Sequence, residues 1–264
     1  EIASERRCQL IIATHSEVLV DGTSPDHVLS FYARPHRLVS DIEREQVREA
    51  LKRLTAMDIL LAEQAPGVLY VEGETDFNLL RAWARVLNHP VYELFRQPFW
   101  RSNQGRHPRE ARAHFFALLA IKAGIKGYLL LDGDNRGLPD HEISTEGLIV
   151  GRWLRYEAES YLLHPEALRR YVENLRGGSL LAEPGTRYLR YQLPGPVFDN
   201  PLGDHDYLNS TPASKTLLPG FFRAVELDLS KNDYYLIAEQ MRPEEIAPEV
   251  KQKLDDVARA LRDV

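Results

Sequence analysis

Apolar and polar positions alternate through the middle of the chain in a pattern that predicts short buried strands and amphipathic helices. Residues 68–71 and 128–131 are continuous apolar runs, which suit strands buried on both faces of a sheet. Between them, 75–87 and 109–123 carry apolar residues at helical spacing, and 91–95 predicts a further strand. The order strand, helix, strand, helix, strand predicts a parallel sheet with covering helices, and therefore an α/β fold.

The segments before this core predict one or two strands and a helix. Residues 8–13 are an apolar run that predicts a buried strand leading into a polar loop, and 27–33 predicts another strand. From Asp41 to about Gln64 the apolar spacing is helical, and Asp41 is the expected N-cap. Ala65-Pro66-Gly67 then breaks the chain before the first strand of the core.

The segments after the core predict mostly helix. Residues 147–150 and 153–156 are expected to form further strands, and 165–176 has a helical pattern. The stretch 177–220 is rich in Gly, Pro, Asp and Asn and gives no clear period, whereas 221–264 is predicted to be mainly helical, with breaks at its two prolines.

Acidic residues follow two of the predicted strands. Glu72 and Asp76 come after the first buried strand, and Asp132 and Asp134 come after the last. In open parallel sheets ligands gather beyond the carboxyl ends of the strands, so these four carboxylates are expected at one edge. Carboxylates that converge repel one another unless cations hold them, and hard oxygen ligands suit Mg²⁺ or Mn²⁺. Two such ions could stabilise the attacking and the leaving oxygens of a phosphodiester displacement.

Each acidic pair has an ordinary alternative explanation when it is taken alone. An isolated Asp-Gly-Asp is usually a surface turn, and a Glu-x-x-x-Asp at the start of a helix is usually solvated charge favoured by the helix dipole. Both pairs here directly follow a buried strand in one alternating pattern, and that combination favours a metal site.

Composition limits the remaining classes of protein. The chain has 264 residues, 44% of them hydrophobic, which is typical of a globular protein with one large domain or two modest ones. Its single cysteine excludes an internal disulfide and a cysteine-rich zinc site. No signal peptide and no apolar run long enough for a bilayer is present, so a cytoplasmic protein without membrane contact is expected. The net charge of -6 does not indicate a nucleic-acid binder, but a cluster of metal-binding carboxylates makes an enzyme look acidic.

Two motifs carry a family resemblance. VLYVEGETD (68–76) followed by LLLDGD (129–134) resembles the Toprim domain of topoisomerases, primases and OLD-family nucleases. CQLIIATHSEVLV (8–20) looks like the end of an ABC-type ATPase domain, in which His15 would be the switch histidine. That combination is the architecture of OLD nucleases, and the resemblance implies that Glu72 is a general acid/base or metal ligand.

The resemblance implies a division of the chain and a reaction. Residues 1–40 would be the end of an ATPase domain, 41–66 a helical linker, 67–163 the Toprim core, and 164–264 a mainly helical region that completes it. The chain would be the catalytic part of a longer protein that cleaves or nicks DNA with two Mg²⁺ or Mn²⁺ ions. No phosphate-loop motif is present, so ATP would bind only a preceding ATPase half. A homodimer is left open.

Three more residues gain a role from the same resemblance. The segment 155–163 is similar to a Glu-x-Glu-Asn-Tyr-Leu motif of the family, with Ser160 where Asn is usual. Glu157 and Glu159 are therefore candidate metal ligands, Glu159 the preferred one, against the alternative of a solvated helix start. Lys215 resembles a lysine near the metals and would stabilise charge on the phosphate, or it is a surface lysine.

The segment 96–112 combines several arginines with two aromatic residues, Phe99 and Trp100. Such a basic, aromatic loop could hold a DNA backbone, or it is simply a solvated loop. The arginines proposed for DNA contact are Arg101, Arg106 and Arg109.

Two other functions remain as alternatives. A topoisomerase or primase Toprim domain would need a nucleophilic tyrosine in a separate domain or a zinc module, and the single Cys8 argues against the latter. A non-catalytic module would bind metal for structure, or would mediate dimerisation and regulate an ATPase.

Overall fold

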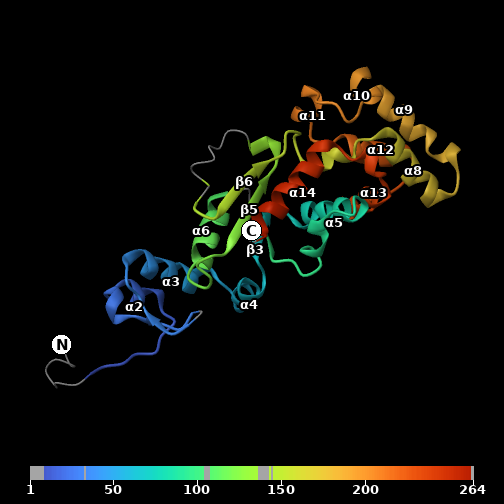
Figure 1. The fold of residues 1–264 in the computed structure, drawn as a ribbon. Coiled ribbons are helices and arrows are strands. Elements are labelled where there is room, and N and C mark those ends of the chain that lie inside the picture. Colours follow the sequence, from blue (N-terminus) through green and yellow to red (C-terminus); the bar gives the residue numbers. More distant parts are fainter. Residues whose placement is uncertain (1–8, 33, 104–107, 136–142, 144, 263–264) are drawn as a thin grey trace. The chain divides into compact units, whose positions relative to one another are not determined.

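The computed structural model describes residues 9–32, 34–103, 108–135, 143 and 145–262 (Figure 1). The chain divides into two compact units, one formed by Glu1–Gln64 with Ala113–Gly124 and the other by Ala65–Arg112 with Ile125–Val264. None of the helices in the described part of the chain has the length and apolar character needed to cross a membrane.

The first unit is small and mostly helical. Its elements are α2 (Glu17–Asp21), η1 (Pro25–His27), β1 (Leu29–Ser30), β2 (His36–Arg37), α3 (Asp41–Arg53) and α4 (Ala56–Gln64), and α6 (Pro108–Leu118) begins in the second unit and ends in this one. The antiparallel strands β1 and β2 are only two residues long. Val20, Leu38 and Val47 form a small buried cluster that fixes α2 and α3.

Two expectations for this unit were wrong, and the segment 41–64, predicted to be helical, is divided into two helices. Residues 9–16 form no strand, because no strand among the described residues pairs with them, and Ile11 stays 82% exposed. The helix expected from Asp41 is capped instead by Ser40, whose hydroxyl accepts a hydrogen bond from Glu43 N (3.2 Å). The helix that begins at Asp41 ends at Arg53. A separate helix begins at Ala56, where the Asp58 carboxylate accepts a hydrogen bond from Thr55 N (2.8 Å) and so caps the new helix.

The second unit is built on a four-stranded parallel sheet. Its strands are β3 (Gly67–Val71), β4 (Trp100–Ser102), β5 (Lys126–Leu131) and β6 (Leu148–Arg152), in the order β4-β3-β5-β6. Leu69 lies opposite Trp100 on one side and Tyr128 on the other. The central strands β3 and β5 are buried nearly throughout, as their apolar sequences predict. The expected α/β fold is confirmed.

The edge of the sheet differs from the prediction. The apolar run 91–95 forms η2 (Pro90–Glu93), because Pro90 has no N–H to donate to a neighbouring strand and the His89 ring accepts from Val91 N (3.2 Å). The edge strand is instead β4, which lies in the segment predicted to be a loop. The expected strand 153–156 is absent, since the chain leaves the sheet after β6.

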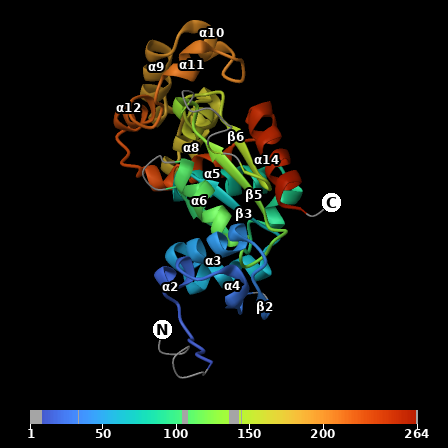
Figure 2. The same ribbon diagram turned by 90° about the vertical axis from the view of Figure 1, so that its left-hand side faces the viewer.

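Helices cover the sheet and continue beyond it. α5 (Glu74–Val86) packs on β3, and α14 (Pro248–Leu261) packs on both β3 and β5, as Figures 1 and 2 show. The other elements after the sheet are η4 (Ala158–Leu162), α8 (Pro165–Arg176), η5 (Ser179–Leu181), α9 (Glu183–Gln192), α10 (Gly195–Asp199), α11 (Asp206–Ser210), α12 (Leu217–Ala224), η6 (Lys231–Asp233), α13 (Tyr235–Gln240) and η7 (Pro243–Glu245). The helical C-terminal region is thus confirmed, and it extends into 177–220, where no element was predicted. Pro243 and Pro248 begin helical elements, a position where the missing N–H costs nothing.

Candidate metal centre

Three carboxylates meet at the carboxyl edge of the sheet. Glu72 directly follows β3, Asp132 directly follows β5, and Asp134 lies in the turn η3 (Gly133–Asn135). Each offers an oxygen, and these oxygens all lie within 4.8 Å of one another. The topology places them there because the two strands are parallel neighbours and end together.

A close backbone approach holds the Asp-Gly-Asp turn in place. A Cβ atom on Gly133 would lie 2.2 Å from the carbonyl oxygen of Arg155, so only glycine fits at this position. Asp134 N donates to the carbonyl of Tyr156 (3.2 Å), and Trp153 N donates to that of Leu131 (2.9 Å). The turn is therefore fixed against the segment that leads from β6 to the next acidic residues.

Asp76 stands in the first turn of α5, beside the three clustered carboxylates. Its Oδ2 accepts a hydrogen bond from Gly73 N (2.8 Å), which caps the helix, and the residue is buried. Burial, together with the negative charges of Glu159 and Glu72, raises the pKa of Asp76 to about 7, although the bond from Gly73 opposes the shift.

Glu157 and Glu159 approach from η4 and are both buried, so the alternative of a solvated helix start does not describe them. Glu157 accepts a hydrogen bond from Ser214 N. Glu159 is fully buried, and its Oε1 lies 2.7 Å from Nζ of Lys231. Its Oε2 has no hydrogen-bond partner among the described residues. A buried carboxylate oxygen of this kind is available to a cation.

Asp132 lies at the centre of this negative charge. Its Oδ1 accepts from Ala158 N (3.3 Å), a bond that ties β5 to η4. Burial raises the pKa of Asp132 to about 10, and the carboxylates of Asp76, Glu72, Glu159 and Glu157 add to the shift. The arrangement therefore favours the ionised form only when positive charge is supplied.

Lys231 brings positive charge to the cluster, although no local pattern of residues indicates this role. It stands in η6, which precedes α13, and α13 packs on α5. Burial would lower the pKa of Lys231, but the carboxylates of Glu159, Glu157 and Asp76 raise it overall, so the ammonium group is retained. The nearby Tyr234 is buried, and burial with the charge of Glu159 raises its pKa to about 12.

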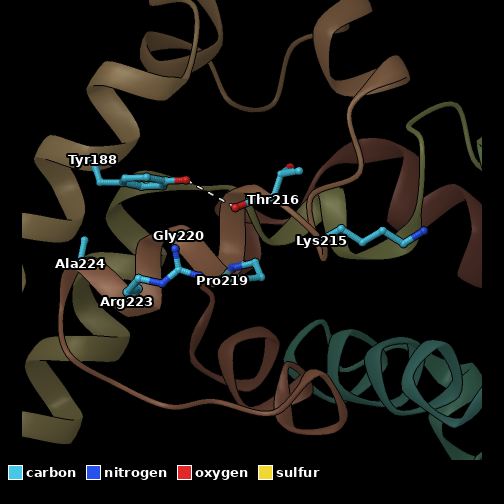
Figure 3. A pocket seen from close by; sticks show the side chains of 7 residues that line it. All are labelled: Tyr188, Lys215, Thr216, Pro219, Gly220, Arg223 and Ala224. Carbon is cyan, nitrogen blue, oxygen red and sulfur yellow. Dashed lines mark hydrogen bonds between the residues drawn. The ribbon is translucent and has the colours of Figure 1, made fainter.

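Lys215 directly follows Ser214, whose N–H donates to the Glu157 carboxylate. With Tyr188, Thr216 and Arg223 it lines a pocket of about 380 Å³ between α9 and α12. In Figure 3 its side chain extends away from Tyr188 and Arg223. Among the residues described, Lys231 is the lysine that the structure places against Glu159, and the role expected for Lys215 stays a prediction.

The remaining predicted residues are spread over both units. Arg101 lies in β4, Arg109 is exposed in the first turn of α6, and Arg106 lies outside the described residues. His15 is exposed in the first unit. Asn103, which was not singled out from the sequence, is a buried amide directly after β4 and has no side-chain hydrogen bond within the described residues.

The fold and the site together define a Toprim-like α/β domain with an acidic cluster at the carboxyl edge of its sheet. Among solved structures, the chain is similar to the C-terminal region of the Burkholderia pseudomallei OLD protein (14% identity, 75% of this chain and 99% of that chain, TM-score 0.44). It is also similar to the C-terminal region of the Xanthomonas campestris pv. campestris OLD protein (15% identity, 75% and 96%, TM-score 0.39). These proteins carry the family name that the sequence motifs resemble. No protein-family model and no curated protein matches the chain.

Proposed function

We propose that this chain is the catalytic region of a metal-dependent nuclease that hydrolyses DNA phosphodiester bonds. The observation that supports the proposal is the convergence of Glu72, Asp132 and Asp134 within 4.8 Å at the edge of a parallel sheet. Asp76 and Glu159 add buried charge beside them. Grouped carboxylates at this kind of edge are the ligands that a two-metal phosphodiester site needs.

The donor set fits Mg²⁺ or Mn²⁺. All the side-chain donors are carboxylate oxygens, and no thiol or imidazole belongs to the described cluster. Glu159 Oε2 is buried without a hydrogen bond among the described residues, and the pKa of Asp132 is raised by burial and then by the neighbouring carboxylates. Glu72, Asp132 and Asp134 would hold one cation, with Asp76, Glu159 and Glu157 available to a second.

The residues of the chain would divide the reaction between them. Bound divalent cations would polarise the scissile phosphate and lower the pKa of an attacking water. Glu72 would accept the proton of that water as its oxygen forms a bond to phosphorus and the bond to the leaving sugar oxygen breaks. Lys231 would offset negative charge on the phosphate, a role that the family resemblance also implies for Lys215.

An ATPase partner domain is part of the proposal. Leu10, Ile11 and Ile12 are exposed in the first unit, although they form the apolar run that resembles the end of an ABC-type ATPase. Exposed apolar runs usually mark a contact surface. ATP would bind that partner domain, and His15 would be the switch histidine of its ATPase site. DNA would be the substrate of the second unit.

Plasmid cleavage tests the nuclease proposal. Supercoiled plasmid is incubated with the chain and Mg²⁺, Mn²⁺, Ca²⁺ or EDTA, beside Glu72→Gln and Asp132→Asn, whose folding is verified by thermal melting. We expect nicked or linear plasmid with Mg²⁺ or Mn²⁺ and at least about a hundredfold loss in both variants. If the wild type is inert with every metal, or if both variants cut equally well, the proposal fails. A non-catalytic module that regulates an ATPase would then be favoured.

A further inference from the structure

A second cavity opens beside the carboxylate cluster. It has a volume of about 500 Å³, within the usual range for ligand pockets, and its lining includes Asn78, Trp100, Asn232 and Asp233. Two of the segments that form its wall also supply the candidate site. The first turn of α5, which closely follows Glu72, contributes Glu74 and Thr75 to the lining, and η6 contributes both Lys231 and two lining residues.

One wall of the cavity is a rigid aromatic surface. Trp100 stacks on Phe77 with ring centroids 4.9 Å apart and planes within 5°. Phe77 is buried and meets Phe95 edge-on at 5.5 Å, so the stack is anchored in the core. The Trp100 side chain is only half-buried. A planar indole held in this way is a platform on which a nucleobase can stack.

The polar wall of the cavity suits the edge of a base better than a phosphate. Glu74 and Asp233 are acidic and would repel a phosphate, whereas Arg81 supplies a single positive charge, 5.9 Å from the Phe77 ring. The amide groups of Asn78 and Asn232 can both donate and accept hydrogen bonds. Carboxylates accept hydrogen bonds only, so they match the exocyclic amino groups of cytosine, adenine or guanine and not the carbonyl of thymine.

We infer that this cavity binds one unstacked, amino-bearing nucleobase of the DNA strand next to the phosphate that is cut. The inference rests on the proposed nuclease function and narrows its substrate. A base can enter such a cavity only when it leaves the helical stack, which costs least in single-stranded or damaged DNA. The chain therefore prefers a substrate in which at least one base is free to rotate outward.

Binding of labelled oligonucleotides to the full chain tests the inference without cleavage, in buffer with Ca²⁺. The probes are oligo(dC), oligo(dT) and a backbone of the same length without bases. We expect oligo(dC) to bind about tenfold more tightly than the abasic backbone. Trp100→Ala should remove that difference, and Trp100→Phe should keep most of it. Tyr191→Ala, an aromatic side chain that is 86% exposed elsewhere, is the matched control and should change nothing.

Two further measurements test the hydrogen-bonding wall of the cavity and whether the bound base belongs to a DNA strand or to a free nucleotide. Oligo(dC) should bind several-fold more tightly than oligo(dT), and Asp233→Asn should reduce that ratio while thermal melting stays unchanged. Oligo(dC) should also quench the tryptophan fluorescence far more than free dCMP does at the same base concentration. This quenching reports on Trp100, because Trp83 and Trp153 are buried.

Three results would overturn the inference. In the first, Trp100→Ala weakens binding of the abasic backbone and of oligo(dC) by the same factor. In the second, oligo(dC) and oligo(dT) bind the wild type with equal affinity. In the third, dCMP quenches the fluorescence as strongly as oligo(dC), which would indicate a site for free nucleotides. The plasmid assay stays independent of these results. Cleavage without base discrimination would contradict only the inference that the cavity binds a nucleobase. Base-dependent binding without cleavage would contradict only the proposed nuclease function.

Discussion

Lys231 and Glu159 form an ion pair, with Nζ and Oε1 2.7 Å apart, between two short helical turns that are remote in sequence. Glu159 is fully buried, whereas about half of the Lys231 side chain is exposed. The pair therefore joins the carboxylate cluster to the surface, where a phosphate group would arrive.

Replacement of Lys231 by Met is expected to lower both stability and activity. Loss of the ammonium group leaves Glu159 buried without its partner, and we expect the metal-free protein to lose about 1–3 kcal/mol, less than for a fully buried pair because Lys231 is half-exposed. Cleavage should fall by about a hundredfold. Lys251→Met, at an exposed lysine of α14, is the matched control for stability and should leave the melting temperature unchanged. Equal melting of Lys231→Met and wild type in EDTA would contradict the structural role of the pair.

The metal-free protein is expected to melt at lower temperature as the pH rises from 5 to 8. The pKa of Asp76 in the folded state is about 7, above its ordinary value of 3.8. The folded protein thus binds this proton more tightly than the unfolded chain does, and the resulting stability is lost as the pH rises through 7. Thermal melting in EDTA across this range measures the effect. Mg²⁺ should restore stability more at pH 8 than at pH 5. Asp76→Asn should make the profile less steep but not flat, because burial and the neighbouring carboxylates raise the pKa of Asp132 to about 10. A profile in EDTA that is already flat in the wild type would show that Asp76 ionises without hindrance.

Gly133→Ala is expected to disturb the acidic turn. Its new Cβ would lie 2.2 Å from the Arg155 carbonyl, so the turn must shift, at a cost of about 1–3 kcal/mol. The shift would move Asp132 and Asp134 and weaken Mg²⁺ binding, which calorimetry can follow. Gly178→Ala is the control, since no atom lies within 4 Å of its Cβ position. Full Mg²⁺ affinity in Gly133→Ala would rule out this account of the turn.

Arg155→Lys is expected to destabilise the second unit although it keeps the charge. The buried guanidinium donates to the carbonyls of Ser160 (3.0 Å), Pro201 (2.7 Å) and Gly203 (3.3 Å), and it lies 4.6 Å from the Tyr161 ring centroid. A lysine cannot reproduce this fork, so about 2 kcal/mol of unfolding free energy should be lost. Urea unfolding measures the loss, and the exposed Arg85→Lys provides the baseline. A change no larger than that of Arg85→Lys would show that the carbonyl contacts contribute little.

The sequence predicted the parts of the site that depend on strand ends. Glu72, Asp132 and Asp134 follow apolar runs long enough to be read as buried strands, and a parallel sheet brings such ends together. Lys231 could not be found in this way, because it reaches the cluster only through the packing of α13 on α5. No local pattern encodes a contact between elements so far apart.

The errors in the fold have a related cause. β4 is a short edge strand of Trp100-Arg101-Ser102, too polar and too brief to show a strand pattern, and the backbone of β3 defines it. The run 91–95 has a strand-like composition, but Pro90 directs it into a helical turn. The apolar residues 10–12 have strand character, but no strand among the described residues pairs with them.

The order of the elements along the chain has a consequence for synthesis on the ribosome. The first carboxylates leave the ribosome with β3, but η6 and its Lys231 follow much later, and α14, which packs on β3 and β5, follows η6. A growing chain therefore holds an incomplete and poorly packed centre until α14 has also been synthesised. The proposed nuclease would thereby stay inactive until these late elements are in place.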